Sequence, residues 1–157
     1  LRRSRGLGDV YKRQLFFISI SIAVDFSSKV SEFCVMTDPK LFKLTNKDKL
    51  HYRKLIKNID PDHERLIVEL LRKKIQNILD TGNLNSVEVE LIKDIEKLNY
   101  ILLRKHDLSA YVVKKILFAM SYVIDEDDEI PDFIPKYGYL DDISVVEWII
   151  NDIKKDI

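Results

Sequence analysis

The chain has 157 residues, and its 26 Lys and Arg residues are balanced by 26 Asp and Glu residues. A length of this order suits one domain, and the lack of a net basic charge argues against a general nucleic-acid-binding protein. Charged residues make up 33% and apolar residues 46% of the sequence, with only four glycines and four prolines, which excludes long flexible linkers.

The first 14 residues resemble a translated sequencing adapter. Residues 9–14 read DVYKRQ, which is one reading frame of the transposon-end adapter GATGTGTATAAGAGACAG. Residues 15–24 are apolar and follow Lys12 and Arg13, as in a signal peptide, but this run is too short to span a bilayer, which needs about 20 residues. We therefore expect residues 1–35 to be an adapter artefact and upstream read-through. The alternatives are a genuine basic tail and a truncated export or membrane segment.

Residues 36–157, which begin at Met36, are expected to form a single helical domain. They contain 20 basic and 23 acidic residues, a net charge of −3. The only cysteine, Cys34, lies before them, so we expect no disulfide framework, thiol nucleophile or cysteine-based metal site. This composition suits a reducing cytoplasm, and membrane association is the alternative location.

Two helices are predicted at the start of this domain. The first follows Thr45, because Asp48 stands three residues later, at the spacing of a capping box. The second begins at Asp60, a capping residue that is followed by Pro61 at the first helical position. Its apolar residues recur at the helical period and stop before Gly82, which is a favoured residue after a helix end.

Three further helices complete the predicted fold. Asn85 and Glu88 have capping-box spacing and start a helix that runs toward His106. The next helix covers about residues 109–124, and the last runs from about Leu140 to the end of the chain. No useful strand-like alternation is present. The sequence therefore predicts an all-α fold, a small single-domain bundle of about five helices.

An acidic connector joins the last two predicted helices. It covers residues 122–142 and reads YVIDEDDEIPDFIPKYGYLDD. Pro131 and Pro135 fix φ and remove hydrogen-bond donors, which stiffens the path. Gly138 permits a backbone conformation that other residues resist. The pattern predicts a shaped loop, not a flexible tether.

The connector resembles the signature of the domain of unknown function 1232 family, also called YkvA-like. That signature reads approximately Y-x-I-x-P-x-D-L-I-P-D-x-I-P-x-x-G-Y-x-D-D. The positions that follow it in register are Tyr122, Ile124, Asp128, Ile130, Pro131, Asp132, Ile134, Pro135, Gly138, Tyr139, Asp141 and Asp142. Glu126 replaces a proline and Glu129 replaces an apolar residue, so the front of this connector is more acidic than in relatives. The resemblance covers about residues 109–142 and implies an all-helical domain.

The acidic residues of the connector allow two interpretations. Ca²⁺ and Mg²⁺ bind several converging carboxylate oxygens, so the candidate metal ligands are Asp128, Asp132, Asp141 and Asp142. The spacing does not match an EF-hand loop. We favour the second interpretation, in which short acidic side chains form capping and loop hydrogen bonds. Asp141 and Asp142 stand at the start of the last helix, where they can meet free N–H groups and the positive end of the helix dipole.

No catalytic residue is predicted. Paired carboxylates would need one acid with a raised pKa and a partner in a suitable geometry. His51, His63 and His106 are isolated and lack metal-ligand spacing. Trp148 is interpreted as a core residue, with a partner or membrane-interface surface as the alternative.

The sequence leaves three functional hypotheses. The first is a non-enzymatic helical accessory or interaction module whose acidic connector is chiefly structural. The second is a domain that binds a divalent metal, with hydrolysis as one use of it. The third is a peripheral membrane module, which the resemblance implies because some relatives carry membrane segments. A protein partner or a membrane surface is expected, nucleic acid is not, and the only cofactors considered are Ca²⁺ or Mg²⁺, under the second hypothesis.

Overall fold

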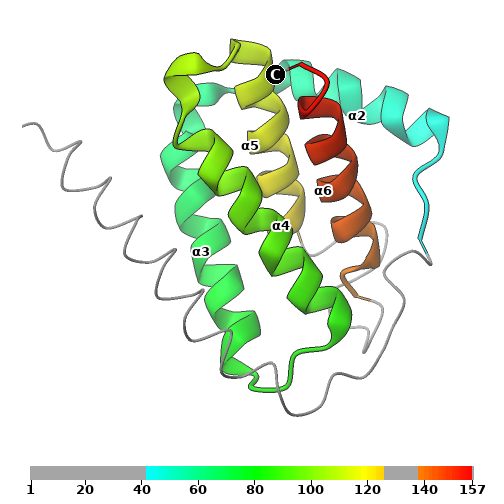
Figure 1. The fold of residues 1–157 in the computed structure, drawn as a ribbon, viewed down its shortest axis with the longest axis vertical. Coiled ribbons are helices and arrows are strands. Elements are labelled where there is room, and N and C mark those ends of the chain that lie inside the picture. The colour runs from blue at the N-terminus through cyan, green and yellow to red at the C-terminus, as the bar shows by residue number, and fades with distance from the viewer. Residues whose placement is uncertain (1–41, 126–137, 157) are drawn as a thin grey trace, which may run out of the picture. The chain divides into compact units, whose positions relative to one another are not determined.

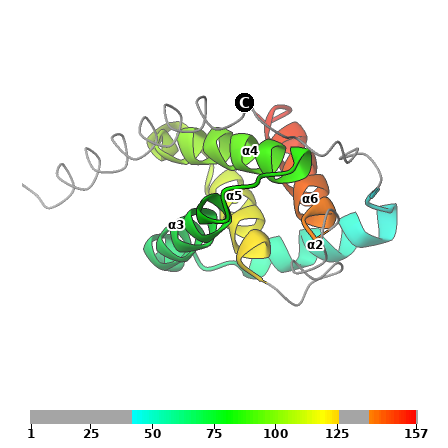
Figure 2. The same cartoon turned by 90° about the horizontal axis from the view of Figure 1, so that it is seen from below.

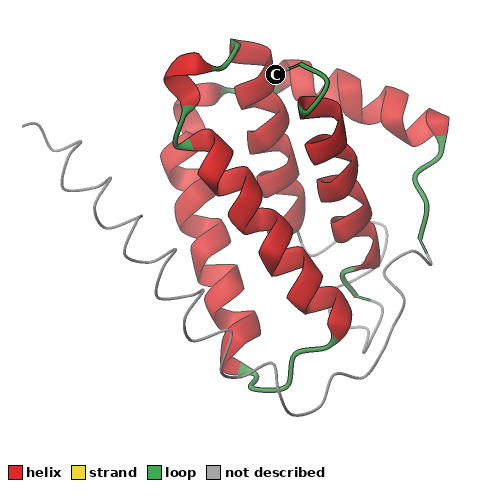
Figure 3. Cartoon of the chain, in the orientation of Figure 1, coloured by secondary structure: helices red, strands yellow, loops and turns green. Residues whose placement is uncertain are grey.

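The structure is a computed structural model, and it describes residues 42–125 and 138–156. Within these two ranges it contains five α-helices, two short 3-10 helices and no strand. Figure 3 shows these helices and the loops that connect them. The predicted all-α fold is therefore confirmed. Residues 1–35, which we assign to an adapter and read-through, lie outside the described residues.

Helix α2 (Asn46–Asn58) begins with the predicted capping box. The Thr45 hydroxyl accepts a hydrogen bond from the Asp48 amide, and the Asp48 carboxylate accepts one from the Thr45 amide at 2.8 Å. The Thr45 hydroxyl also donates a hydrogen bond to the Asp48 carboxylate at 2.7 Å, and this bond, together with the one from the Thr45 amide, holds the pKa of Asp48 below its ordinary value. An aspartate thus performs here the role that a glutamate usually has in this motif.

Helix α3 (Glu64–Asp80) begins one short turn later than predicted. Asp60 accepts a hydrogen bond from the Asp62 amide at 3.0 Å, but the turn that it caps is the 3-10 helix η2 (Pro61–His63), which leads into α3. Such turns are common at helix N-termini. At the other end Gly82 adopts a φ of 75°, as expected for a residue just past a helix end.

Helix α4 (Ser86–Leu102) has the predicted capping box between Asn85 and Glu88. It ends before His106, earlier than predicted. The chain turns after Leu102 into the 3-10 helix η3 (Lys105–Asp107), because it has to reverse direction before the next helix.

Helices α5 (Ala110–Ile124) and α6 (Leu140–Ile153) form the centre of the bundle. Helix α5 contacts α2, α3, α4 and α6, and α6 also contacts α4. Their buried apolar residues are Val112, Ile116, Leu117, Phe118, Ala119, Met120, Val123, Leu140, Ile143, Val145, Val146, Ile149, Ile150 and Ile153. Figure 1 shows α5 and α6 side by side, with α3 and α4 next to them.

Helix α2 differs from the other helices in its direction. It packs against α5 and runs across the bundle at a steep angle (Figure 2). Only Tyr52 and Ile56 of this helix are buried. Helix α2 therefore presents most of its surface to the outside of the bundle. None of the helices in the described ranges combines the length and the hydrophobicity that crossing a bilayer requires.

Candidate functional site

The two ends of the acidic connector converge in the part of the structure that is described. Tyr122 lies in the last turn of α5, and Asp141 and Asp142 lie in the first turn of α6. Both aspartates are fully buried, with 0% of each residue exposed. Their position places them at the positive end of the α6 dipole, which favours negative charge. The N-cap residue itself, Tyr139, makes no side-chain capping bond, and the capping role that the sequence suggests for the two aspartates stays a prediction.

A chain of polar contacts joins three helices at this end of the bundle. The Tyr122 hydroxyl donates a hydrogen bond to Oδ2 of Asp141 at 3.3 Å. The Tyr52 hydroxyl of α2 lies 3.3 Å from the Tyr122 hydroxyl. Because α2, α5 and α6 each contribute one residue, the contact ties the two central helices to the helix that crosses them.

Aromatic rings surround these hydroxyl groups. The Tyr52 ring meets the Tyr122 ring nearly edge-on, with centroids 5.6 Å apart and an interplanar angle of 72°. It also lies 5.5 Å from the Phe118 ring and 6.2 Å from the Trp148 ring. Edge-on and tilted arrangements at these distances are favourable for aromatic pairs. Trp148, which the sequence interpretation placed in the core, is only partly buried, and its ring packs against Tyr52 at the edge of this cluster.

Lys74 of α3 contacts both described ends of the connector. Its ammonium group donates a hydrogen bond to the backbone carbonyl of Asp125 at 3.3 Å. The same nitrogen lies 5.8 Å from the centre of the Tyr139 ring, within the range of a cation–π interaction. One side chain therefore links the residue that follows α5 to the residue that precedes α6.

The other predicted site residues have mixed outcomes. Gly138 is buried in the turn before α6. Asp128, Pro131, Asp132 and Pro135 lie outside the described residues. Among the residues that are described, no group of three or more His, Cys, Asp or Glu side chains is arranged to hold a metal ion. The four-aspartate metal site therefore remains a hypothesis, with two of its ligands placed.

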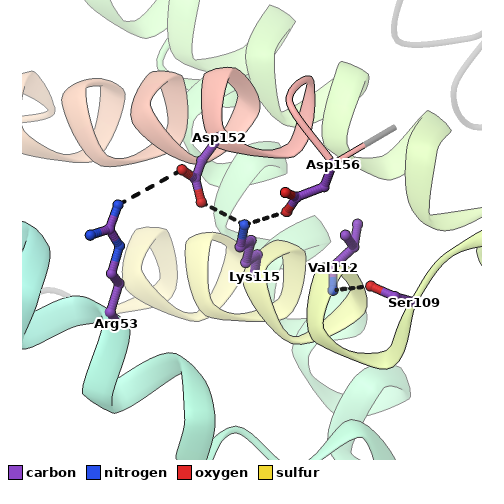
Figure 4. A network of polar contacts seen from close by, with 6 residues as sticks. All are labelled: Arg53, Ser109, Val112, Lys115, Asp152 and Asp156. Carbon is purple, nitrogen blue, oxygen red and sulfur yellow. Dashed lines mark hydrogen bonds and ion pairs between the residues drawn. The ribbon is translucent and has the colours of Figure 1, made fainter.

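A second polar cluster, which sequence reasoning missed, lies at the other end of the same helix pair (Figure 4). Lys115 of α5 is only 4% exposed. Its ammonium nitrogen lies 2.5 Å from Oδ2 of Asp152 and 2.6 Å from Oδ2 of Asp156. Arg53 of α2 approaches Oδ1 of Asp152 at 4.0 Å. The features of the sequence that bear on this cluster are a lysine within an apolar helix and two acids spaced four residues apart, and neither one identifies its partner.

The charge state of Lys115 follows from two opposing effects. Burial by itself lowers the pKa of this lysine, because it disfavours the charged form. The hydrogen bonds and negative charges of Asp152 and Asp156 outweigh burial and raise the pKa above its ordinary value. Lys115 is therefore protonated at neutral pH, and the cluster is an ion triple that connects α5 with the end of α6.

The arrangement of the described residues is suited to holding helices together. Two of the four carboxylates that sequence reasoning selected, Asp141 and Asp142, are enclosed at a helix start, and the buried lysine is paired with two acids. The three histidines are exposed and lie in three separate elements, α2, η2 and η3.

Comparison with known proteins connects the site to a family. The model of the family described as "Protein of unknown function (DUF1232)" matches residues 112–148. This match confirms the resemblance that the connector showed in the sequence. The matched segment begins in α5 and ends in α6, so it contains the connector and most of the central helix pair. No curated protein and no solved structure matches the chain.

Proposed function

We propose that this domain is a non-enzymatic helical accessory or interaction module in which the acidic connector is chiefly structural. The observation that carries this proposal is the burial of Asp141 together with its hydrogen bond from Tyr122. This contact spans the connector and fixes how α5 meets α6. The family match supports the importance of the segment, since both residues lie within the matched range.

The burial of the two aspartates favours a structural role over a catalytic one. A buried carboxylate is costly unless hydrogen bonds or opposite charges compensate for its lost hydration. Tyr122 and the N-terminal end of α6 provide such compensation for Asp141. A hydrolytic site would instead need carboxylates that a substrate and water can reach.

Metal addition tests this proposal against its main competitor. Thermal unfolding of the full chain is measured in chelator and in millimolar Ca²⁺, Mg²⁺ or Mn²⁺. A ligand that binds only the folded state raises its stability by about 2.7 kcal/mol at 100 times its dissociation constant. We expect no metal-dependent rise in the melting temperature.

The matched variant is Asp142→Asn, which removes one proposed ligand. A rise in melting temperature that occurs with metal in the wild-type protein and disappears in this variant would establish a metal site and refute the structural proposal. If metal changes the melting temperature of neither the wild type nor the variant, the Asp142 carboxylate has its role without a bound metal.

A further inference from the structure

Positive charge is concentrated in one segment of the domain. Residues 43–57 contain six Lys or Arg residues and a single acid, Asp48, a net charge of +5. The rest of residues 36–157 contains 14 basic and 22 acidic residues, a net charge of −8. A contrast of this size between parts of one chain indicates an electrostatic interaction surface. Helix α2 contains most of the basic segment.

The direction in which α2 faces makes this charge available. Tyr52 and Ile56 lie four residues apart and form the buried face of the helix. Lys47, Leu50, Lys54 and Lys57 follow steps of three, four and three residues and occupy the opposite face. We call these four residues the outer stripe of α2. All four are exposed.

The outer stripe combines an apolar side chain with cations. Leu50 is 59% exposed, and its neighbours along the stripe are lysines on both sides. Within the described ranges, none of the three stripe lysines forms an ion pair with an acidic side chain. The cation that does pair is Arg53, which lies beside the stripe and reaches Asp152.

The helix that bears the stripe is held firmly on the bundle. Tyr52 joins the aromatic cluster and contacts the Tyr122 hydroxyl. Lys114 of α5 donates a hydrogen bond to the carbonyl of Lys57 at 2.9 Å, which satisfies one carbonyl in the last turn of α2. The stripe is thus a fixed surface, and binding to it costs little ordering of the backbone.

We infer that the outer stripe of α2 docks the domain on an anionic lipid surface. Helices that lie in a membrane interface carry lysines whose apolar stems reach past leucines while their ammonium groups stay among the lipid phosphates. Lys47 and Lys54 flank Leu50 in this manner. This inference rests on the proposed function, a non-enzymatic interaction module, and names the partner of that module.

Two other classes of partner fit the stripe less well. A nucleic acid is usually bound with arginines or stacked aromatic rings, and the four stripe residues are lysines and a leucine. A protein partner that recognises a helix face does so through several apolar anchors at helical spacing, whereas this stripe has one apolar residue.

Vesicle flotation of the full chain tests the inference. The vesicles consist of phosphatidylcholine alone or with one third phosphatidylglycerol. We expect the wild-type protein to float only with the anionic vesicles and to lose binding as salt is raised, because salt screens charges. Each lysine near an anionic surface strengthens binding roughly fivefold, so the combined change Lys47→Gln, Lys54→Gln and Lys57→Gln is expected to weaken it about 100-fold. The change Leu50→Ala is expected to weaken it roughly tenfold.

Matched control variants separate the stripe from charge and hydrophobicity in general. The combination Lys93→Gln, Lys154→Gln and Lys155→Gln removes the same charge from exposed residues of α4 and of the turn after α6. Leu66→Ala removes a leucine of α3 that is 55% exposed. Binding of both control variants is expected to change by less than threefold, and the melting temperatures of all variants are checked against the wild type.

Each other outcome overturns the inference. Wild-type protein that stays unbound with anionic vesicles refutes it, as does an equal loss of binding in the stripe and control variants. Stripe-dependent binding to a DNA or RNA oligonucleotide without binding to vesicles would assign the surface to nucleic acid instead. None of these results changes the response to metal, so failure here is distinct from failure of the proposed function.

Discussion

The two ends of the α5–α6 pair are held together by different chemistry. At the connector end, Tyr122 donates a hydrogen bond to Asp141, and aromatic rings enclose the contact. At the far end, Lys115 forms ion pairs with Asp152 and Asp156. The connector end lies within the family match, whereas both acids of the far end lie beyond it. The hydrogen bond between α5 and α6 at the connector end thus lies within residues 112–148, which the family model matches. The ion pairs at the far end use two acids that lie beyond this segment.

The largest effect is expected from Lys115→Ala. This change removes a buried cation, leaves two carboxylates facing each other and opens a cavity between α5 and α6. Breaking a buried ion pair costs about 3–5 kcal/mol. We expect about 3 kcal/mol of lost stability in urea unfolding, because Asp156 is partly exposed. Lys155→Ala, at an exposed position, is the control. A loss below about 1 kcal/mol would show that the ion triple matters little.

High pH should reduce the stabilisation that the Lys115 ion pairs provide at the far end of the helix pair. The pKa of Lys115 is raised in the folded protein above its ordinary value of 10.5. The stabilisation is therefore fully present below the unfolded pKa and is lost as the pH rises through the folded pKa. We expect unfolding free energies of the wild type to fall in that alkaline range more steeply than those of Lys115→Met. Parallel pH profiles of the two proteins would contradict this account.

The connector end should respond more weakly to loss of a single hydroxyl. Tyr122→Phe keeps the ring and removes the hydrogen bond to Asp141. Hydrogen bonds contribute about 0.5–1.5 kcal/mol between neutral groups and about 1.5–3 kcal/mol when one group is charged, and the value where these ranges meet is taken for this contact at 3.3 Å. Urea unfolding should show a loss of about 1.5 kcal/mol, with Tyr100→Phe, an exposed tyrosine, as the control. An equal loss in both variants would mean that the buried contact has no special role.

The smallest effect is expected from Lys74→Met. This change removes the hydrogen bond to the Asp125 carbonyl and the interaction with the Tyr139 ring, while the methionine retains much of the apolar stem. Interactions of partly exposed cations contribute about 0.5 kcal/mol. Lys73→Met is the control, because among the described residues Lys73 pairs with Glu69 of its own helix and with no residue of another element. A loss of unfolding free energy as large as that of Tyr122→Phe would contradict this ranking and would show that Lys74 holds the ends of the connector as strongly as Tyr122 does.

The parts of the fold that were predictable are those that depend on local sequence. The capping pairs Thr45 with Asp48 and Asn85 with Glu88 appear as expected, because both partners lie within one turn. Helix ends were less predictable: α4 ends before His106, where the chain reverses into η3. The residue at which a helix ends depends on how the following helix packs, and the local sequence of one turn does not specify this packing.

The same distinction applies to the candidate site. Tyr122 and Asp141 were identified through the family signature, although their contact spans 19 residues. The ion triple joins Lys115 to Asp156 across 41 residues, and no motif relates them. Lys115 lies within an apolar helix, and only the packing of α6 against α5 shows that Asp152 and Asp156 meet it. Long-range polar pairs of this kind follow from tertiary structure and not from local pattern.

We expect the contact between Tyr122 and Asp141 at the connector end to be structural and independent of metal. A double-mutant cycle of Tyr122→Phe and Asp141→Asn, measured by urea unfolding in chelator and again in millimolar Ca²⁺ or Mg²⁺, tests it most directly. We predict a coupling energy of about 1 kcal/mol that is the same in both conditions. Coupling that is absent in chelator, together with stabilisation of the wild type by metal, would contradict the claim.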